Sequence, residues 1–146
     1  MHQSTLPCDF ALPAEWEPQS AIMLTWPHAG TDWKPYLPEI TDTYLELADI
    51  ITRYEQLLVA TPDVPATRYQ LKKKLSAEQM SRVLLYEVES NDTWVRDHGP
   101  LTMVLRRKQN TWMVPYRILD FKFNGWGEKF RWEKDNAITL QLYYQA

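Results

Sequence analysis

Short apolar runs alternate with longer amphipathic stretches over the N-terminal part of the chain. The apolar runs lie at 21–27, 56–62 and 82–89, and the first two end at a proline. Apolar runs of this length, bounded by turn residues, are typical of buried β-strands. The pattern therefore predicts three strands in this part of the chain.

Two helices are predicted between these strands. From Pro35 to Tyr54, apolar residues recur at alternating spacings of three and four. This spacing places them on one face of an amphipathic helix, and Pro35 and Pro38 are tolerated because they fall in its opening turn. A second, more polar helix is predicted over 65–75. Strands that alternate with helices in this way indicate an α/β fold.

The remainder of the chain predicts a hairpin and a last helix. Two strands at 101–107 and 111–119 flank the turn sequence Lys-Gln-Asn. Residues 120–130 alternate polar and apolar positions before a Gly-Trp-Gly loop, and 133–145 predict the helix. The residues expected on one side of that helix are Ile138, Leu142 and Tyr143.

Composition narrows the class of protein. A chain of 146 residues, 45% hydrophobic and 24% charged, matches one globular domain. The net charge of −3 argues against nucleic-acid binding, and no apolar run is long enough to span a membrane. The N-terminus MHQSTLPCDF lacks a basic, apolar leader, so no secretory signal is expected. The single cysteine, Cys8, excludes an internal disulfide and favours a reducing, cytoplasmic location.

Seven tryptophans and eight tyrosines are the unusual feature of the composition. For most of them, core filling or interface anchoring is the simpler interpretation. A few lie beside Gly, Pro or Asp at predicted strand ends, where they could line a pocket for a cation or a sugar. The charges that surround them, and the lack of Asn and Gln nearby, argue against a sugar.

Sequence motifs for common cofactors and metals are absent. The chain has no P-loop, GxGxxG, HExxH or CxxC, and His2, His28 and His98 lie far apart. No cofactor is therefore expected. Asp92 and Asp97 could hold a divalent ion with His98, but Arg96 between them favours an ion-pair network instead, so no metal is expected.

Charged and aromatic residues are densest in NDTWVRDHGP, residues 91–100. If this segment continues as an extended strand, Asp97 points to one side, and Trp94 and Arg96 point to the other. For Asp92 and Arg96, a structural turn with a neutralised carboxylate is as good an interpretation as a site. Asp97 is better explained by function, because a carboxylate is the bidentate partner of a planar guanidinium.

Three segments, MLTWP (23–27), NDTWVRDHGP (91–100) and DFKFNGWGEKF (120–130), occur in that order. With them the chain resembles the N-terminal part of the agmatine deiminase and bacterial, Porphyromonas-type, peptidylarginine deiminase family. This family belongs to the guanidino-group-modifying superfamily, the penteins. The resemblance extends from about Trp16 to the last predicted helix.

The resemblance implies a fold and a reaction. Family members form an α/β propeller of five ββαβ modules, of which this chain would supply about two, as the N-terminal portion (1–146) of a single deiminase domain. A cysteine attacks the guanidinium carbon, ammonia leaves, and hydrolysis gives a ureido product, with a His-x-Asp pair supplying acid and base. The residues matched to the family's substrate-binding positions are Asp97 for the guanidinium, with Trp94, Asp92, Trp26 and Trp126.

The chain departs from the family pattern at the catalytic groups. It has no His-x-Asp, Cys8 lies at the wrong end for the nucleophile, and Glu128 stands where a small residue is expected. Both catalytic motifs would lie downstream, so the chain alone is expected to be an inactive fragment whose uncovered apolar edges promote self-association into oligomers.

Three functions follow as hypotheses. The first is hydrolysis of agmatine to N-carbamoylputrescine and ammonia, in the biosynthesis of putrescine. The second is conversion of peptidyl arginine to citrulline. The third is a non-catalytic module that binds a small cationic, guanidino-type ligand. All three have the same kind of ligand, and none involves nucleic acid or a membrane.

Overall fold

The computed structural model describes residues 10–105 and 116–145, and the chain divides into two compact units. The larger unit consists of Gln19–Gly99 and Lys122–Ala146, and the smaller unit of Met1–Pro18 and Pro100–Phe121. Both contain a β-sheet, and the helices belong to the larger unit. The fold is α/β, as the alternating pattern predicts.

A three-stranded parallel sheet is the centre of the larger unit. Its strands lie in the order β2 (Ala21–Thr25), β3 (Gln56–Thr61) and β4 (Val83–Glu87). In the middle of the sheet, Leu58 pairs with Met23 on one side and with Leu84 on the other. The three apolar runs of the sequence are therefore strands, as predicted.

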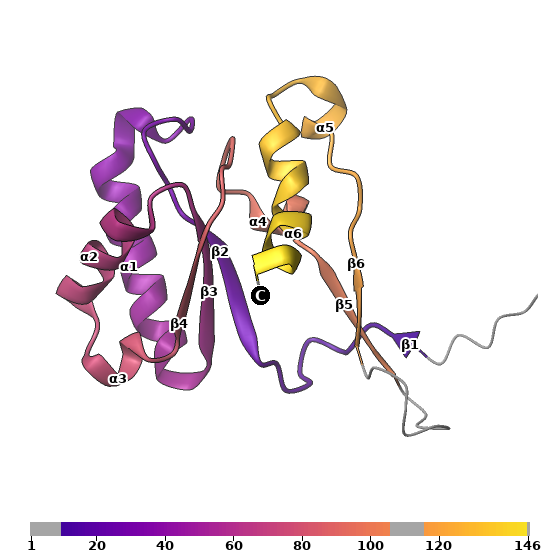
Figure 1. Cartoon of the computed structure of the whole chain (residues 1–146), viewed down its shortest axis with the longest axis horizontal. Helices are drawn as coiled ribbons and strands as arrows, with labels where there is room; N and C mark the ends of the chain where they lie inside the picture. Colours follow the sequence, from indigo (N-terminus) through magenta and orange to yellow (C-terminus); the bar gives the residue numbers. More distant parts are fainter. Residues whose placement is uncertain (1–9, 106–115, 146) are drawn as a thin grey trace, which may run out of the picture. The chain divides into compact units, whose positions relative to one another are not determined.

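The two faces of this sheet are covered by different helices (Figure 1). Side chains along a strand alternate between faces, so Leu57 and Val59 of β3 point to one side and Leu58 and Ala60 to the other. On the first face, Leu57 and Val59 are fully buried with Ile51 of α1 (Leu37–Tyr54).

The first face carries the predicted helices in sequence order. A single 3₁₀ turn (Lys34–Tyr36) leads into α1, so both prolines lie in or beside the opening turn, where their missing N–H groups cost nothing. Helix α2 (Val64–Lys74) is capped by Asp63, whose side chain accepts a hydrogen bond from Ala66 N at 2.8 Å. A short helix that the apolar pattern did not predict, α3 (Ala77–Met80), follows it.

The second face of the sheet is covered by α6 (Glu133–Gln145), from the end of the described chain. Its buried side chains Ile138 and Leu142 are one helical turn apart and pack with Ala60 and Val88. Tyr143 was expected on the same side, which is wrong: it is 71% exposed. Five helical positions separate it from Ile138, which turns it away from the sheet.

The smaller unit is an antiparallel sheet in the order β1 (Phe10–Ala11), β5 (Leu101–Leu105) and β6 (Tyr116–Leu119). Strands β5 and β6 pair antiparallel, which confirms the predicted hairpin pairing. The predicted Lys-Gln-Asn turn lies outside the described residues. Nothing in the sequence pattern predicted β1.

Within the described ranges, none of the helices combines the length and apolar character that crossing a lipid bilayer requires.

Candidate functional site

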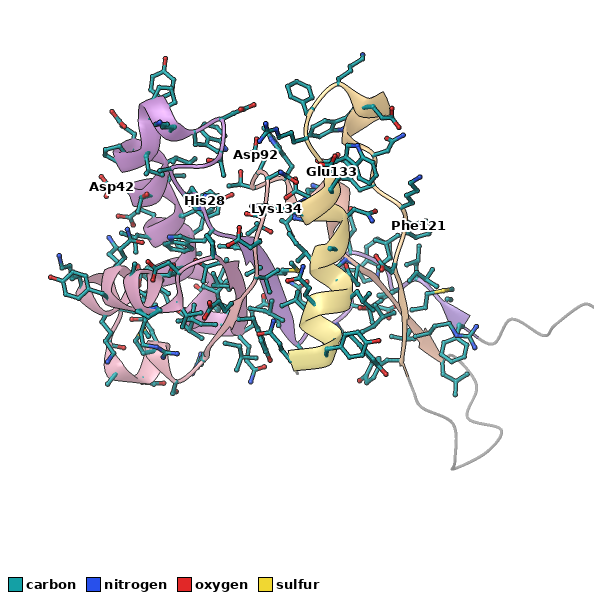
Figure 2. The ribbon with its side chains drawn as sticks, turned by 45° about the horizontal axis from the view of Figure 1, so that its top comes forward. His28, Asp42, Asp92, Phe121, Glu133 and Lys134 are labelled. Atoms are coloured by element: carbon teal, nitrogen blue, oxygen red, sulfur yellow. The ribbon has the colours of Figure 1, made fainter. Side chains whose placement is uncertain are left out.

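A cavity of about 1070 Å³ lies in the larger unit. Its walls come from three segments: 28–36 after β2, 90–97 after β4, and 126–135 leading into α6. Because β2 and β4 are parallel, the segments that follow them leave the same edge of the sheet. Figure 2 labels one residue from each wall, His28, Asp92 and Lys134.

Residues Val95–His98 form a helical turn, α4, so the extended geometry that was considered for this segment is not the one it adopts. The turn is closed by hydrogen bonds from Asp97 N to Trp94 O at 2.9 Å and from Gly99 N to Val95 O at 2.7 Å. Residues three apart in a helical turn lie on the same side. Trp94 and Asp97 therefore both line the cavity, instead of pointing to opposite faces.

A chain of aromatic rings forms one wall of the cavity. Trp94 lies between Trp33, with ring centroids 6.3 Å apart, and Trp126, at 6.4 Å with the rings nearly perpendicular. The ring of Trp126 also packs against that of Phe130, with centroids 5.7 Å apart. Both Trp94 and Trp126 are nearly half exposed, so their π-faces are accessible from the cavity.

Asp97 is joined to this aromatic wall. The indole Nε1–H of Trp126 donates a hydrogen bond to Asp97 Oδ1 at 3.2 Å. Among the described residues, the Asp97 side chain makes no other hydrogen bond and no ion pair. A carboxylate can accept about four hydrogen bonds, so Asp97, which is exposed and lines the cavity, keeps accepting capacity for a ligand.

The segment that carries Trp126 has an unusual backbone. Four consecutive residues, Gly125–Glu128, have positive φ angles of 60°, 55°, 86° and 63°. They form a left-handed turn, labelled α5 in Figure 1, which Asn124 closes by accepting Gly127 N at its side chain. Glycine adopts this region freely, but Trp126 and Glu128 do so at a cost.

The loop 91–93 is held by the first turn of α6. Asp135 accepts the backbone N–H of Asn91 at 2.6 Å and that of Asp92 at 3.2 Å. The Asp135 side chain is 2% exposed, and this burial raises the pKa of its carboxyl group, while the two N–H donors counteract the rise. Asp92 itself lines the cavity and accepts the backbone N–H of the next residue, Thr93, at 2.7 Å.

His28 and Ser90 lie side by side in the cavity wall, with His28 Nε2 3.1 Å from Ser90 Oγ. Gly30 N donates to His28 Nδ1 at 3.1 Å, so Nδ1 is the acceptor and the ring hydrogen is on Nε2. Burial lowers the pKa of His28. In this tautomer Nε2 donates to Ser90 and cannot take its proton, so the pair is not a nucleophile and its base.

Trp26 and His98 lie in the interior, outside the cavity lining. Trp26 is 2% exposed; its Nε1–H donates to Gln70 Oε1 at 3.0 Å, and its ring packs edge-on against Tyr44. Of the five residues matched to substrate binding, it is the one that the structure does not bring to the cavity. His98 is 3% exposed, its Nε2 lies 3.0 Å from Thr25 Oγ1, and burial lowers its pKa to about 4.

The expected ion pair of Arg96 with Asp92 or Asp97 is absent among residues 10–105 and 116–145. The helical turn gives the reason, since it is Trp94, not Arg96, that shares a side with Asp97. In the same part of the chain no three His, Cys, Asp or Glu side chains form a group that could hold a metal ion. Cys8 lies outside the described residues.

Several residues of the site were not predicted from the sequence. Trp33 and His28 line the cavity, but the pattern at 28–34 reads only as a break after a strand. Asp135 reads as an ordinary acidic residue at a helix start. The indole N–H of Trp33 donates to Thr93 Oγ1 at 2.9 Å, a contact across 60 positions that local sequence patterns do not reveal.

A model of the Porphyromonas-type peptidyl-arginine deiminases matches residues 11–146. The chain belongs to this family of guanidino-group-modifying enzymes. Among solved structures, C. jejuni agmatine deiminase is 32% identical with a TM-score of 0.75, and a substrate-bound form of it reaches a TM-score of 0.78. A Porphyromonas gingivalis protein with the provisional name arginine deiminase is 40% identical, with a TM-score of 0.73.

These relatives are longer than the chain. The alignment with the C. jejuni structure covers 93% of this chain and 37% of that one. A Yersinia pestis protein, provisionally named an agmatine deiminase, is 30% identical over 138 residues, which are 91% of this chain and 34% of the relative. The chain thus spans about a third of the length of the curated relatives that it matches.

Proposed function

We propose that this chain forms the guanidinium-binding wall of a cytoplasmic deiminase that hydrolyses agmatine to N-carbamoylputrescine and ammonia, in the biosynthesis of putrescine. The observation that carries the proposal is that Asp97, Trp94 and Trp126 line one cavity, with Trp126 hydrogen-bonded to Asp97. Membership in the deiminase family supports the same reaction class.

The chemistry of these three side chains suits a guanidinium. A planar fork of N–H donors binds a carboxylate bidentately, and Asp97 has unused accepting capacity toward the cavity. The indole faces of Trp94 and Trp126 attract a cation at short range and cover the flat faces of a guanidinium well. Asp92, on the same wall, is the group proposed for the distal ammonium of agmatine.

In this proposal the chain supplies groups that bind the substrate, and not the catalytic groups. In the proposed reaction an activated thiolate attacks the guanidinium carbon, and a positioned proton donor protonates the leaving ammonia. The 146 residues contain one cysteine, Cys8, and no His-x-Asp. In the proposed enzyme these groups come from other modules of a five-module propeller, in which residues 1–146 supply about two modules of one domain.

Agmatine titration of the chain, followed by calorimetry, tests the proposal. Asp97→Asn should weaken binding by roughly 10- to 150-fold, because a charge-assisted contact contributes roughly 1.5–3 kcal/mol. Asp42→Asn is the matched control: it removes the same charge from the exposed surface of α1, and Figure 2 labels its position. Putrescine, a diamine without a guanidinium, should bind much more weakly than agmatine.

Other outcomes assign the site differently. If the unmutated chain binds no agmatine, or if Asp97→Asn binds it unchanged, the guanidinium site is refuted. Equal affinity for putrescine and agmatine would indicate a general cation-binding module, without specificity for a guanidinium.

Peptidyl arginine is the second candidate substrate. The description of the matching family, peptidyl-arginine deiminase, favours it. An Nα-acetyl-arginine amide carries the guanidinium and the peptide groups but lacks the distal ammonium of agmatine. Tighter binding of this compound than of agmatine, with the same dependence on Asp97, would assign the site to peptidyl arginine.

A further inference from the structure

The first turn of α6 binds two segments of the cavity wall through consecutive side chains. Asp135 accepts the N–H groups of Asn91 and Asp92, and Asn91 returns the contact by accepting Lys134 N at 2.9 Å. The next residue, Asn136, accepts Phe123 N at 2.8 Å. The partners of the two side chains lie on opposite sides of α4 in the sequence.

The residues held by these hydrogen bonds are in turn close to the side chains that line the cavity, in sequence or by ring packing. Asp92 leads through Thr93 to Trp94, and the ring of Phe123 packs edge-on against Trp126 with centroids 5.2 Å apart. Trp126 in turn hydrogen-bonds Asp97. The first turn of α6 is therefore linked to both indoles, Trp94 and Trp126, that line the cavity with Asp97.

The contacts differ from ordinary helix capping. An acidic residue in a first turn usually faces solvent and acts on its own helix terminus. Asp135 is instead 2% exposed, and its hydrogen bonds reach residues 43 and 44 positions away. A buried carboxylate is costly unless it is hydrogen-bonded, so this arrangement holds the loop 91–92 in one place.

We propose that Asp135 and Asn136 are positioning residues of the guanidinium site: Asp135 places the wall that carries Asp92 and Trp94, and Asn136 places the wall that carries Trp126. The assignment of the site itself rests on the proposed function. The hydrogen bonds do not, and the experiment separates the two.

The experiment uses the whole chain, labelled with ¹⁵N, and compares Asp135→Asn, Asn136→Ala and Glu133→Gln with the unmutated protein. Glu133 is the control, because it is an exposed carboxylate in the same helical turn (Figure 2). Asp135→Asn should move the amide signals of Asn91 and Asp92 and the indole N–H signal of Trp94. Asn136→Ala should move the signals of Phe123 and of the Trp126 indole.

Agmatine affinity is measured on the same variants. Loss of either positioning residue should weaken binding about tenfold, with Asp97 still present, because a misplaced partner forfeits most of a charge-assisted contact. Glu133→Gln should leave both the spectrum of the site and the affinity unchanged. If Glu133→Gln reproduces the effects of Asp135→Asn, the cause is helix-end charge and the inference is overturned.

Failure of this inference differs from failure of the proposed function. Indole signals and affinities that stay unchanged in both variants, in a chain that does bind agmatine, would overturn the inference and leave the function standing. Moved indole signals in a chain that binds no agmatine would remove the function and keep the positioning roles. If a variant does not fold, hydrogen exchange of the backbone amides in the unmutated chain tests the inference instead. Rapid exchange at Asn91 and Asp92 would show that their N–H groups are not bonded to Asp135, and would refute the inference.

Discussion

His28 and His98 are both neutral in the fold, and their surroundings differ. The Nδ1 atom of His28 accepts Gly30 N, which fixes the ring in a turn at the edge of the cavity. His98 is more deeply buried, beside Thr25 of β2, and in the described part of the chain its Nδ1 has no hydrogen-bond partner. Burial disfavours the charged imidazolium more than the nearby Asp97 carboxylate favours it, so protonation of His98 and folding oppose each other.

The stability of the chain should therefore fall as the pH is lowered from about 6.5 to about 4. The folded pKa of His98, about 4, lies below its ordinary value of 6.5, so the unfolded chain takes up the proton first. The stability from neutral His98 is fully present above 6.5 and is lost as the pH falls to the folded pKa, by about 3 kcal/mol in all.

Urea unfolding of the chain and of His98→Gln, from pH 7 to pH 4, measures this contribution. Glutamine can keep a hydrogen bond to Thr25 Oγ1 but does not titrate in this range. Subtracting the two curves removes the contributions of His28 and of the carboxyl groups, which are common to both proteins. Parallel curves over this range would contradict the assignment to His98.

At the scale of elements, the left-handed turn Gly125–Glu128 is the strained part of the site. A non-glycine residue in this region costs about 1–2 kcal/mol, and Glu128 has a φ of 63°. Glu128→Gly should therefore stabilise the chain by about 0.5–1 kcal/mol, after the greater entropy of glycine in the unfolded state is subtracted.

Glu128→Ala is the matched variant, because it removes the same carboxylate but keeps the Cβ atom that causes the strain. Both are compared with the unmutated chain by urea unfolding. Stabilisation by glycine alone supports backbone strain. Equal stabilisation by alanine would mean that the carboxylate, not the backbone conformation, was unfavourable.

The strands of the parallel sheet and helix α1 were predictable because each has a hydrophobic pattern of its own. The alternation of Leu57 to Ala60 and the helical spacing over Leu37–Tyr54 reflect burial on a sheet face and on a helix face. The turns α4 and Gly125–Glu128 are each four residues long and have no such period. Their conformations depend on contacts such as Gly99 N to Val95 O, and the local pattern therefore left an extended strand and a turn both open for the decapeptide.

At the scale of the whole molecule, the cavity joins residues that are distant in the sequence. Asp97, Trp94, Asp92 and Trp126 were singled out as site residues, and all four line the cavity. Asp135 was not, because its role depends on a buried hydrogen bond across 44 positions, which leaves no mark on local composition. Trp26, next to a strand end in the sequence, belongs to the core because its side chain points toward α1 and α2.

The proposed guanidinium site should bind its ligand without reacting with it. In the described residues the cavity has no thiol, and the one cysteine of the chain, Cys8, precedes them. Without a thiolate to attack the guanidinium carbon, and a group to protonate the leaving ammonia, the barrier to hydrolysis stays near that of the uncatalysed reaction. The chain of residues 1–146, incubated with agmatine, should release ammonia no faster than buffer does.

An enzyme-coupled ammonia assay checks this, with C. jejuni agmatine deiminase as the positive control and Cys8→Ser as the matched variant. If the chain shows turnover and Cys8→Ser abolishes it, Cys8 is the nucleophile and the division of the site between modules is wrong. Turnover that survives Cys8→Ser would require a nucleophile other than cysteine. Absence of turnover together with agmatine binding that depends on Asp97 is the expected result, because binding requires only the carboxylate and its aromatic neighbours.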